Sequence, residues 1–368
     1  MSILKKLKFL AKIIKKEWLF FLFFLLFAIE CFLLKPSFKE LYDSIDFATI
    51  RALLAMMLIT SAFKESSFFD FIAQKSFNFV KTERFLSFTF VGLSVMLSMF
   101  LTNDISLLII VPLTISLKNI IKNDITKLII FEAIGANVGS ALTPVGNPQN
   151  IYLFRQMNIG FIEFMEKMSL IFIPSMLILA IMIWILFKNR PVTIIKTAKT
   201  HINKPLFFIT SFLFILFIAG LEFSFVKYVL ILIFISYLFY PKLFLKIDYF
   251  LIFTFILMFM DFYLLSKFTL FHKLFNIHGF FDVFNASVIL SQIISNVPAT
   301  LLLTHFSHEY LPIAYGSNIA ANGLIIASLA NVIALKPLKG AFLEFHKYSL
   351  IFFFFSYAAV VAILNCLI

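Results

Sequence analysis

Two short polar segments interrupt an otherwise apolar chain, and they hold the residue types best suited to binding an ion. They are Thr102-Asn103-Asp104 and Ser295-Asn296-Val297-Pro298. Each asparagine offers a donor and an acceptor, and a helix that ends at such a break exposes free backbone N–H and C=O groups. Interrupted helices that recur in matching order are typical of duplicated membrane sites. The segments therefore predict a binding site built in two halves, with a simple helix cap as the alternative for either asparagine alone.

A second pair of polar segments follows the first. Residues 135–150 hold three Gly, two Pro and three Asn. Because proline removes a helix donor and glycine weakens a helix, we expect a break near Thr143-Pro144, with a proline kink as the alternative. Residues 316–328 are rich in small side chains, which either contact the site or let helices pack closely. The predicted substrate- and ion-binding residues are Thr102, Asn103, Asp104, Asn137, Thr143, Pro144, Gly146, Asn147, Ser295, Asn296, Val297 and Asn318.

Three carboxylates at predicted membrane depth are candidates for ion coupling: Asp104, Glu132 and Asp261. A charge at that depth costs about 2.5–3.5 kcal/mol on insertion scales, so its presence indicates a function. Asp104 is the first candidate for binding a coupling cation or proton. Glu132 lies near a predicted helix start, where an acid also favours the helix dipole. The face that Asp261 occupies is left open by the sequence.

Catalytic and metal sites are not predicted. His305, His308 and Glu309 are close in sequence but lack the His-Glu-x-x-His order of a zinc helix, so we interpret them as loop residues. Nucleotide loops, nucleophile elbows and paired carboxylates are not apparent in the sequence. We therefore expect no catalytic residue, no metal and no cofactor, with sodium or protons as coupling ions.

The composition requires a membrane protein. Hydrophobic residues make up 62% of the chain, charged residues 14%, and the mean hydropathy is +1.01, whereas soluble proteins are about 45–50% apolar. Continuous apolar runs such as 18–34 and 168–187 exclude a β-barrel, whose strands alternate over about 10 residues. The chain is predicted to be an all-α polytopic membrane protein that contacts the lipid bilayer.

Positive charge predicts the orientation. Most of the 31 Lys and Arg residues fall in alternate loops, beginning with a basic N-terminus at 1–16. The positive-inside rule then predicts a multi-pass protein of the cell (inner) membrane with a cytoplasmic N-terminus. Because these charges do not form one basic face on a soluble domain, we expect no nucleic-acid partner.

Two segments are too short to cross the membrane twice. In the segment 85–117 both flanks are basic, and its second arm, 105–117, has 13 residues. At about 1.5 Å per residue this arm spans about 20 Å, less than the ~30 Å hydrocarbon core. We therefore predict a re-entrant hairpin that enters from the cytoplasmic side. The same reasoning predicts a second hairpin at 283–306 that enters from outside.

The remaining spans form an inverted repeat. The first repeat covers 17–187, a basic cytoplasmic linker covers 188–204, a linking helix covers 205–221 and the second repeat covers 222–368. Each repeat holds four spans with a hairpin between the second and third, and the linking helix inverts the second repeat. The predicted spans are 17–34, 46–63, 128–150 (broken), 168–187, 205–221, 226–240, 247–266, 310–335 (broken) and 348–368.

At these motifs the chain resembles the ion transporter superfamily, in particular its citrate-transporter-like members and its arsenite-pump and sodium–proton-antiporter members, with the divalent anion/sodium symporters as cousins. The resemblance runs through 98–104, 143–150 and 291–298. It implies a homodimer whose fixed scaffold carries a moving, elevator-like transport unit, with the ligand at the hairpin tips and broken helices. Asp104 and Val297 stand where the symporters have threonine, which puts citrate-like transport in doubt.

We therefore expect a secondary active transporter of a small anion, such as a di- or tricarboxylate or an inorganic oxyanion, coupled to sodium or protons. A sodium/proton antiporter or an arsenite efflux permease is the alternative. A membrane-embedded enzyme is a remote alternative, because the loops are short and mostly basic. A passive channel suits the two opposed hairpins less well than alternating access.

Overall fold

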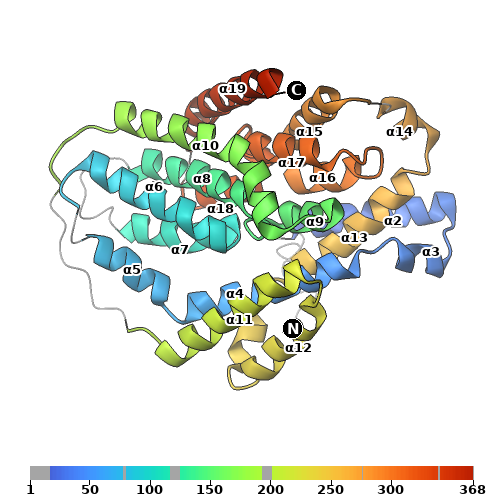
Figure 1. Ribbon diagram of the computed structural model, residues 1–368, viewed down its shortest axis with the longest axis horizontal. Coiled ribbons are helices and arrows are strands. Elements are labelled where there is room, and N and C mark those ends of the chain that lie inside the picture. Colours follow the sequence, from blue (N-terminus) through green and yellow to red (C-terminus); the bar gives the residue numbers. More distant parts are fainter. Residues whose placement is uncertain are drawn as a thin grey trace, which may run out of the picture.

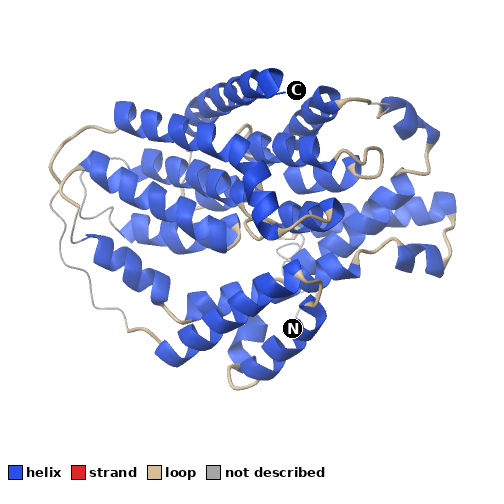
Figure 2. Ribbon diagram, in the orientation of Figure 1, coloured by secondary structure: helices blue, strands red, loops and turns tan. Residues whose placement is uncertain are grey.

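The computed structural model describes residues 17–77, 80–116, 125–192, 201–275, 277–338 and 340–367. Within these ranges the chain is helical almost throughout, and its one isolated β-bridge joins Thr82 and Pro191. Figure 2 shows the same all-helical composition. The prediction of an all-α protein is confirmed. The predicted basic N-terminus, 1–16, and part of the predicted linker, 193–200, lie outside the described residues.

The first half of the chain, up to the linker, contains nine described helices. They are α2 (Trp18–Leu34), α3 (Phe38–Asp43), α4 (Phe47–Glu65), α5 (Phe68–Phe77), α6 (Glu83–Phe100), α7 (Asn103–Ser116), α8 (Ile125–Leu142), α9 (Pro148–Met157) and α10 (Phe161–Leu186). Polar caps begin several of them: the Asp46 side chain accepts from the N–H groups of Ala48 and Thr49 at the start of α4. Such caps satisfy donors that a helix start leaves free.

The second half of the chain contains eleven described elements. Its elements are α11 (Lys204–Glu222), α12 (Val226–Tyr237), η2 (Pro241–Lys246), α13 (Tyr249–Leu265), α14 (Thr269–Leu274), α15 (Phe280–Ile294), α16 (Asn296–Leu303), α17 (Tyr310–Ala320), η3 (Ile325–Ala327), α18 (Leu329–Leu335) and α19 (Phe342–Leu367). Both predicted breaks are confirmed, because α8 ends at Leu142 before α9 begins at Pro148, and α17 ends at Ala320 before α18 begins at Leu329.

Six of the described helices are long and apolar enough to span a membrane: α4, α6, α8, α10, α11 and α19. Helices α2, α7, α12, α13 and α15 are apolar but shorter. The chain is therefore a multi-pass membrane protein. The chain turns back at the end of α6 into α7, and at the end of α15 into α16. The depth of these two hairpins in the bilayer, and the boundaries of the repeats, stay predictions.

Helix α8 is the centre of the bundle. In its apolar stretch 83% of the residues lie inside the protein, against 28% in α10 and α19, whose remaining surface is free to face lipid. Helices α6, α7, α10, α18 and α19 pack against α8, and α2 lies along α13 (Figure 1). Helices α11 and α12 pack on α4. The broken helix of the first half is thus enclosed by elements of both halves.

Close helix contacts explain two of the glycines in the polar segments. A Cβ built on Gly139 of α8 would lie 2.2 Å from the Val95 carbonyl oxygen of α6. A Cβ on Gly316 of α17 would lie 2.5 Å from the Phe284 carbonyl oxygen of α15. Each broken helix therefore packs on the first arm of its own hairpin at a distance that only glycine permits. For Gly316, the alternative that small residues serve packing is the one that applies.

Basic side chains gather at one end of the bundle. The Arg84 Nε donates to the Phe187 carbonyl over 2.9 Å and stacks over the ring of Trp184, and the Lys127 Nζ donates to the Leu186 carbonyl over 2.7 Å. The starts of α6 and α8 and the end of α10 therefore share one face of the protein. The sequence predicts that this face is cytoplasmic.

Candidate functional site

Both hairpin tips share one local contact of an asparagine side chain. Asn103 begins α7, and its side-chain oxygen accepts from the N–H of Asp104 over 3.0 Å. Asn296 begins α16, and its side-chain oxygen accepts from the N–H of Val297, also over 3.0 Å. The turn before α16 is strained, because Ser295 has a φ of 76°. Each asparagine thus bonds to its own helix start, but the N-cap position before α16 is Ser295, whose side chain makes no cap bond.

Asn103 also makes contacts beyond its own helix. Its side-chain Nδ2 donates to the Oδ1 of Asn137 in α8 over 3.1 Å, and its backbone N–H donates to the Gly146 carbonyl over 3.0 Å. The Thr143 hydroxyl donates to the Met99 carbonyl over 2.7 Å. These bonds hold the first tip against the break between α8 and α9. Thr143 and Gly146 therefore position the tip.

The two broken helices are joined to each other by buried amides. Asn137 donates from Nδ2 to the Oδ1 of Asn331 over 2.9 Å, and its own Oδ1 accepts from the Ser328 hydroxyl over 3.1 Å. All three side chains are buried. The first half of the chain is thus bonded directly to the second break.

The reverse arrangement holds for the other half. Asn318 donates from Nδ2 to the Oδ1 of Asn150 over 2.8 Å, and its Oδ1 accepts from the Nδ2 of Asn147 over 2.9 Å. Asn147 and Asn150 follow Asn137 by 10 and 13 residues, and Ser328 and Asn331 follow Asn318 by the same intervals. Exchanging the two halves therefore reproduces the same set of hydrogen bonds.

Asn150 and Asn331 also satisfy the carbonyls that the broken helices leave free. The Asn150 Nδ2 donates to the carbonyls of Ser140, Ala141 and Thr143, and the Asn331 Nδ2 donates to those of Ala321 and Leu324. Buried carbonyls without donors are costly, so these amides stabilise the breaks. Asn150, Ser328 and Asn331 were not among the predicted site residues. The shared 10- and 13-residue spacing is the signal that could have found them.

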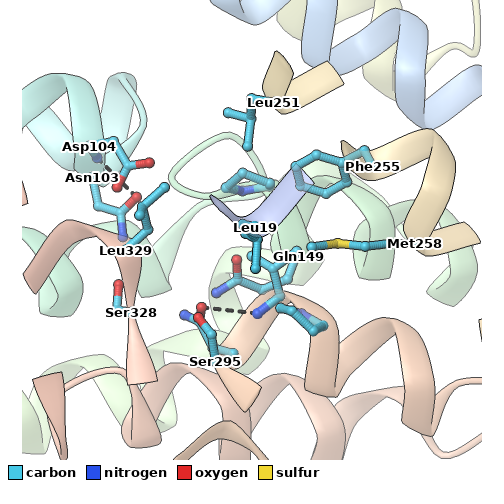
Figure 3. A pocket seen from close by; sticks show the side chains of 14 residues that line it. Leu19, Asn103, Asp104, Gln149, Leu251, Phe255, Met258, Ser295, Ser328 and Leu329 are labelled. Carbon is cyan, nitrogen blue, oxygen red and sulfur yellow. Dashed lines mark hydrogen bonds between the residues drawn. The ribbon is translucent and has the colours of Figure 1, made fainter. Parts of the chain in front are cut away.

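Four helices begin at one small cavity of about 50 Å³ (Figure 3). The first residues of α7 and α16 come from the two tips, and those of α9 and α18 follow the two breaks. Side chains of α13 and α2 form the apolar wall. The lining residues are Leu19, Asn103, Asp104, Pro148, Gln149, Leu251, Phe255, Met258, Ser295, Asn296, Val297, Pro298, Ser328 and Leu329. Each helix start contributes a positive dipole end. Part of the N–H groups are already used, because those of Asp104, Val297 and Asn150 donate to neighbouring asparagine side chains.

Gln149, like Ser328, is a polar residue of this cavity that was not among the predicted site residues. Its side chain is 1% exposed, and within the described residues neither its Oε1 nor its Nε2 has a hydrogen-bond partner. A buried amide left without partners costs about 1–3 kcal/mol. Gln149 can therefore supply both a donor and an acceptor to a ligand in the cavity (Figure 3).

A larger cavity of about 270 Å³ adjoins the first. The two share Asp104, Pro148, Leu251, Phe255 and Leu329, and Thr102 lines the larger one. The larger cavity extends to Lys246 and Asp248, at the turn between α12 and α13. It therefore connects the smaller cavity with a charged surface loop.

The predicted site residues are distributed over these features. Asn103, Asp104, Ser295, Asn296 and Val297 line the smaller cavity. The amides of Asn137, Asn147 and Asn318 lie in the buried network beside it, and Asn318 also lines a separate space of about 10 Å³. Pro144 is buried in the break. The asparagines of the broken helices therefore frame the cavity without forming its wall.

The other two predicted coupling residues lie away from the cavity. Glu132 is buried in α8, accepts a hydrogen bond from the Thr114 hydroxyl of α7, and lies beyond the first turn of α8, where a dipole effect fades. Asp261 is buried on α13 and faces Glu30 of α2. Of the three carboxylates, Asp104 is the one that lines the cavity.

No metal centre competes with this interpretation in the part of the chain that the structure describes, where no group of three or more His, Cys, Asp or Glu side chains could hold an ion. The His308 ring pairs with the Tyr310 hydroxyl over 3.1 Å.

Known proteins match most of the chain. Residues 9–330 match the family described as citrate transporter. The uncharacterized transporter MJ0456 of Methanocaldococcus jannaschii is 37% identical over 317 residues, which are 82% of this chain and 84% of that protein. The inner membrane protein YbiR of Escherichia coli is 34% identical over 314 residues, which are 83% and 84%. The mouse P protein is 29% identical over 174 residues, which are 44% of this chain and 21% of that protein.

Proposed function

The chain belongs to the citrate transporter family, and from that premise we propose that it is a secondary active transporter of a small anion, such as a di- or tricarboxylate or an inorganic oxyanion. One observation carries the proposal: the starts of α7, α9, α16 and α18 line a single cavity. Helix starts attract negative charge because the positive ends of their dipoles lie at the cavity.

The size of the cavity limits what it can enclose. A space of about 50 Å³ takes a few heavy atoms, since a single water needs roughly 10–15 Å³ in the same measure. A carboxylate group or a small oxyanion therefore fits between the helix starts, with the Gln149 amide as an additional donor. The rest of a larger carboxylate would extend into the adjoining cavity of about 270 Å³.

Asp104 gives the coupling ion a place beside the anion. Its carboxylate lines the cavity at the start of α7 and would repel an anion unless a proton or a sodium ion neutralises it. Coupled binding of cation and anion follows from this arrangement. The same carboxylate favours a second candidate, in which the protein is a sodium/proton antiporter or an arsenite efflux permease.

The mode of movement and the assembly belong to the same proposal. We propose a homodimer in the inner membrane with a cytoplasmic N-terminus, in which the two hairpins and the two broken helices move together past a fixed scaffold. The amide network supports this unit, because it bonds the two breaks to each other and to the first tip.

Flux into proteoliposomes tests the proposal. The purified protein is reconstituted and supplied with labelled citrate, succinate, sulfate or phosphate under an imposed sodium or proton gradient. We expect gradient-driven uptake of at least one anion, a large loss of uptake in Gln149→Ala, and full uptake in the exposed control Asn365→Ala. Sodium, proton or arsenite flux without anion flux would favour the second candidate. No flux of any tested ion would refute the transporter proposal.

A further inference from the structure

Two carboxyl groups face each other inside the protein, away from the cavity. Glu30 lies on α2 and Asp261 on α13, two helices that pack side by side. Glu30 is 2% exposed and Asp261 is fully buried. The two side chains lie within interaction distance of each other. The sequence showed no paired carboxylates, because these residues are separated by most of the chain.

Neither carboxyl group has a donor. Within the described residues, none of the four side-chain oxygens of Glu30 and Asp261 has a hydrogen-bond partner, and no basic side chain pairs with them. Buried carboxylates in proteins are normally paired with cations or accept several hydrogen bonds. This pair lacks both, so something other than the described side chains must stabilise it.

One further titratable group interacts with the pair. Cys31, next to Glu30 on α2, interacts with both carboxyls. Helix α16, which packs on α13, has no titratable residue, and α4, which also packs on α13, carries Arg51, Lys64 and Glu65. None of these three contributes to the electrostatic interactions of Glu30 or Asp261.

Two buried carboxyl groups in contact can be stabilised in only a few ways. Two negative charges in contact in a medium of low dielectric repel strongly, and each also loses its hydration. A carboxylic acid that donates to a carboxylate removes one charge and supplies the missing donor, as in carboxyl dyads that share one proton. A metal ion would gain ligands from only two side chains, which is a poor site.

We propose that Glu30 and Asp261 form a proton-binding site at the interface of α2 and α13. In the folded protein an O–H group of one carboxyl donates to the carboxylate of the other. Met258, one turn before Asp261 on α13, lines the cavity, and Leu19 of α2 lies on the same wall. A change in the protonation of the pair therefore acts on the packing of the two helices that form the apolar wall.

One part of this proposal rests on the proposed function: the proton held by the pair serves as the coupling ion for transport. Loss of the proton leaves two charges that push α2 and α13 apart. Binding of the proton draws these helices together and restores the wall beside the ligand. The proton would thus act at a site separate from the anion.

Infrared difference spectroscopy tests the proton site without transport. The wild-type protein should show the C=O band of a buried carboxylic acid at neutral pH, and the band should shift in D₂O. The band should be lost in Glu30→Gln/Asp261→Asn and kept in Glu40→Gln, an exposed carboxylate that pairs with Lys267. An unchanged band in the double variant would overturn the proposal. If the double variant does not fold, Glu30→Gln alone should remove the band, because its amide can donate to Asp261.

Transport measurements then test the coupling role separately. In proteoliposomes the double variant should still exchange labelled anion at equilibrium. Its anion accumulation driven by a proton gradient should be at least tenfold lower than that of the wild type. Accumulation equal to wild type would overturn the coupling role while the infrared band still reports the proton site. Absence of flux in the wild-type protein would instead count against the proposed function, and it would leave the band as the measure of this site.

Discussion

Removing the contact between Asn318 and Asn150 should show how firmly the two broken helices hold each other. Asn318→Ala deletes one donor to the Asn150 Oδ1 and one acceptor for the Asn147 Nδ2. Asn147 keeps a weaker bond to the Ser140 carbonyl at 3.3 Å, whereas the Oδ1 of Asn150 is left without a donor. The main cost is therefore one unsatisfied buried oxygen.

The expected magnitude follows from these bonds. An unsatisfied buried polar atom costs about 1–3 kcal/mol, so Asn318→Ala should lower the free energy of unfolding by about 2 kcal/mol. A double-mutant cycle with Asn150→Ala isolates the pair itself. Interhelical hydrogen bonds in membranes average about 0.6 kcal/mol and reach about 1.7 kcal/mol in such cycles. We expect a value near 1 kcal/mol, because both side chains are buried and the bond is short.

The matching amide bonds of the two halves allow a stricter test. The cycle for Asn137→Ala and Asn331→Ala should give a coupling energy equal to that of Asn318 and Asn150 within about 0.5 kcal/mol, because the amide bond within each pair has the same donor, acceptor and burial. The assay is denaturant unfolding in mixed micelles followed by circular dichroism, and Asn365→Ala, which is exposed, should change stability by less than about 0.5 kcal/mol. Couplings near zero, or present in only one half, would refute this reasoning.

Three further predictions use other parts of the structure. Gly139→Val should lower the unfolding temperature strongly, because its Cβ would strike a backbone carbonyl. The loss in free energy of unfolding should exceed the ~1–3 kcal/mol typical of overpacking. Gly92→Ala is the control, since a Cβ there has free space and should leave thermal unfolding unchanged. Gln149→Leu should raise stability by about 1 kcal/mol while lowering anion flux, because it removes a buried unpartnered amide; lower stability with unchanged flux would contradict this role. The backbone N–H of Ser37, and then Lys267, hold the pKa of Glu40 below its usual range. Protection of the α3 amides from hydrogen exchange should therefore persist at neutral pH and fall as the pH drops through that lowered pKa. A Glu40→Gln variant should show no such change.

Much of the fold could be predicted because helix breakers and apolar runs act locally. Pro144 and Pro148 lie where α8 must stop and α9 must start, and the positions of the first residues of α7 and α16 follow from Asn103 and Asn296. Steric and capping effects of this kind depend on a few neighbouring residues. These segments also hold five of the residues that line the cavity, namely Asn103, Asp104, Ser295, Asn296 and Val297.

The remaining residues depend on contacts that a single sequence does not reveal. Asn150 lies in a polar motif of the sequence, but its role follows from a partner 168 residues away. Glu30 lies within the apolar run 18–34, and its environment depends on Asp261 of another helix. Gln149 is informative because its side chain lacks a partner, and only packing shows this.

The hydrogen bonds of the amide network should not depend on pH. A coupled transporter operates between two solutions that differ in pH and salt, and ion pairs or histidines at its centre would change strength from one side to the other. The bonds among Asn137, Asn150, Asn318 and Asn331 join neutral groups that do not titrate. The hydrogen bonds that frame the cavity should therefore keep the same strength at either pH, and in the proposed coupled transport the response to a gradient falls to carboxyl groups such as Asp104.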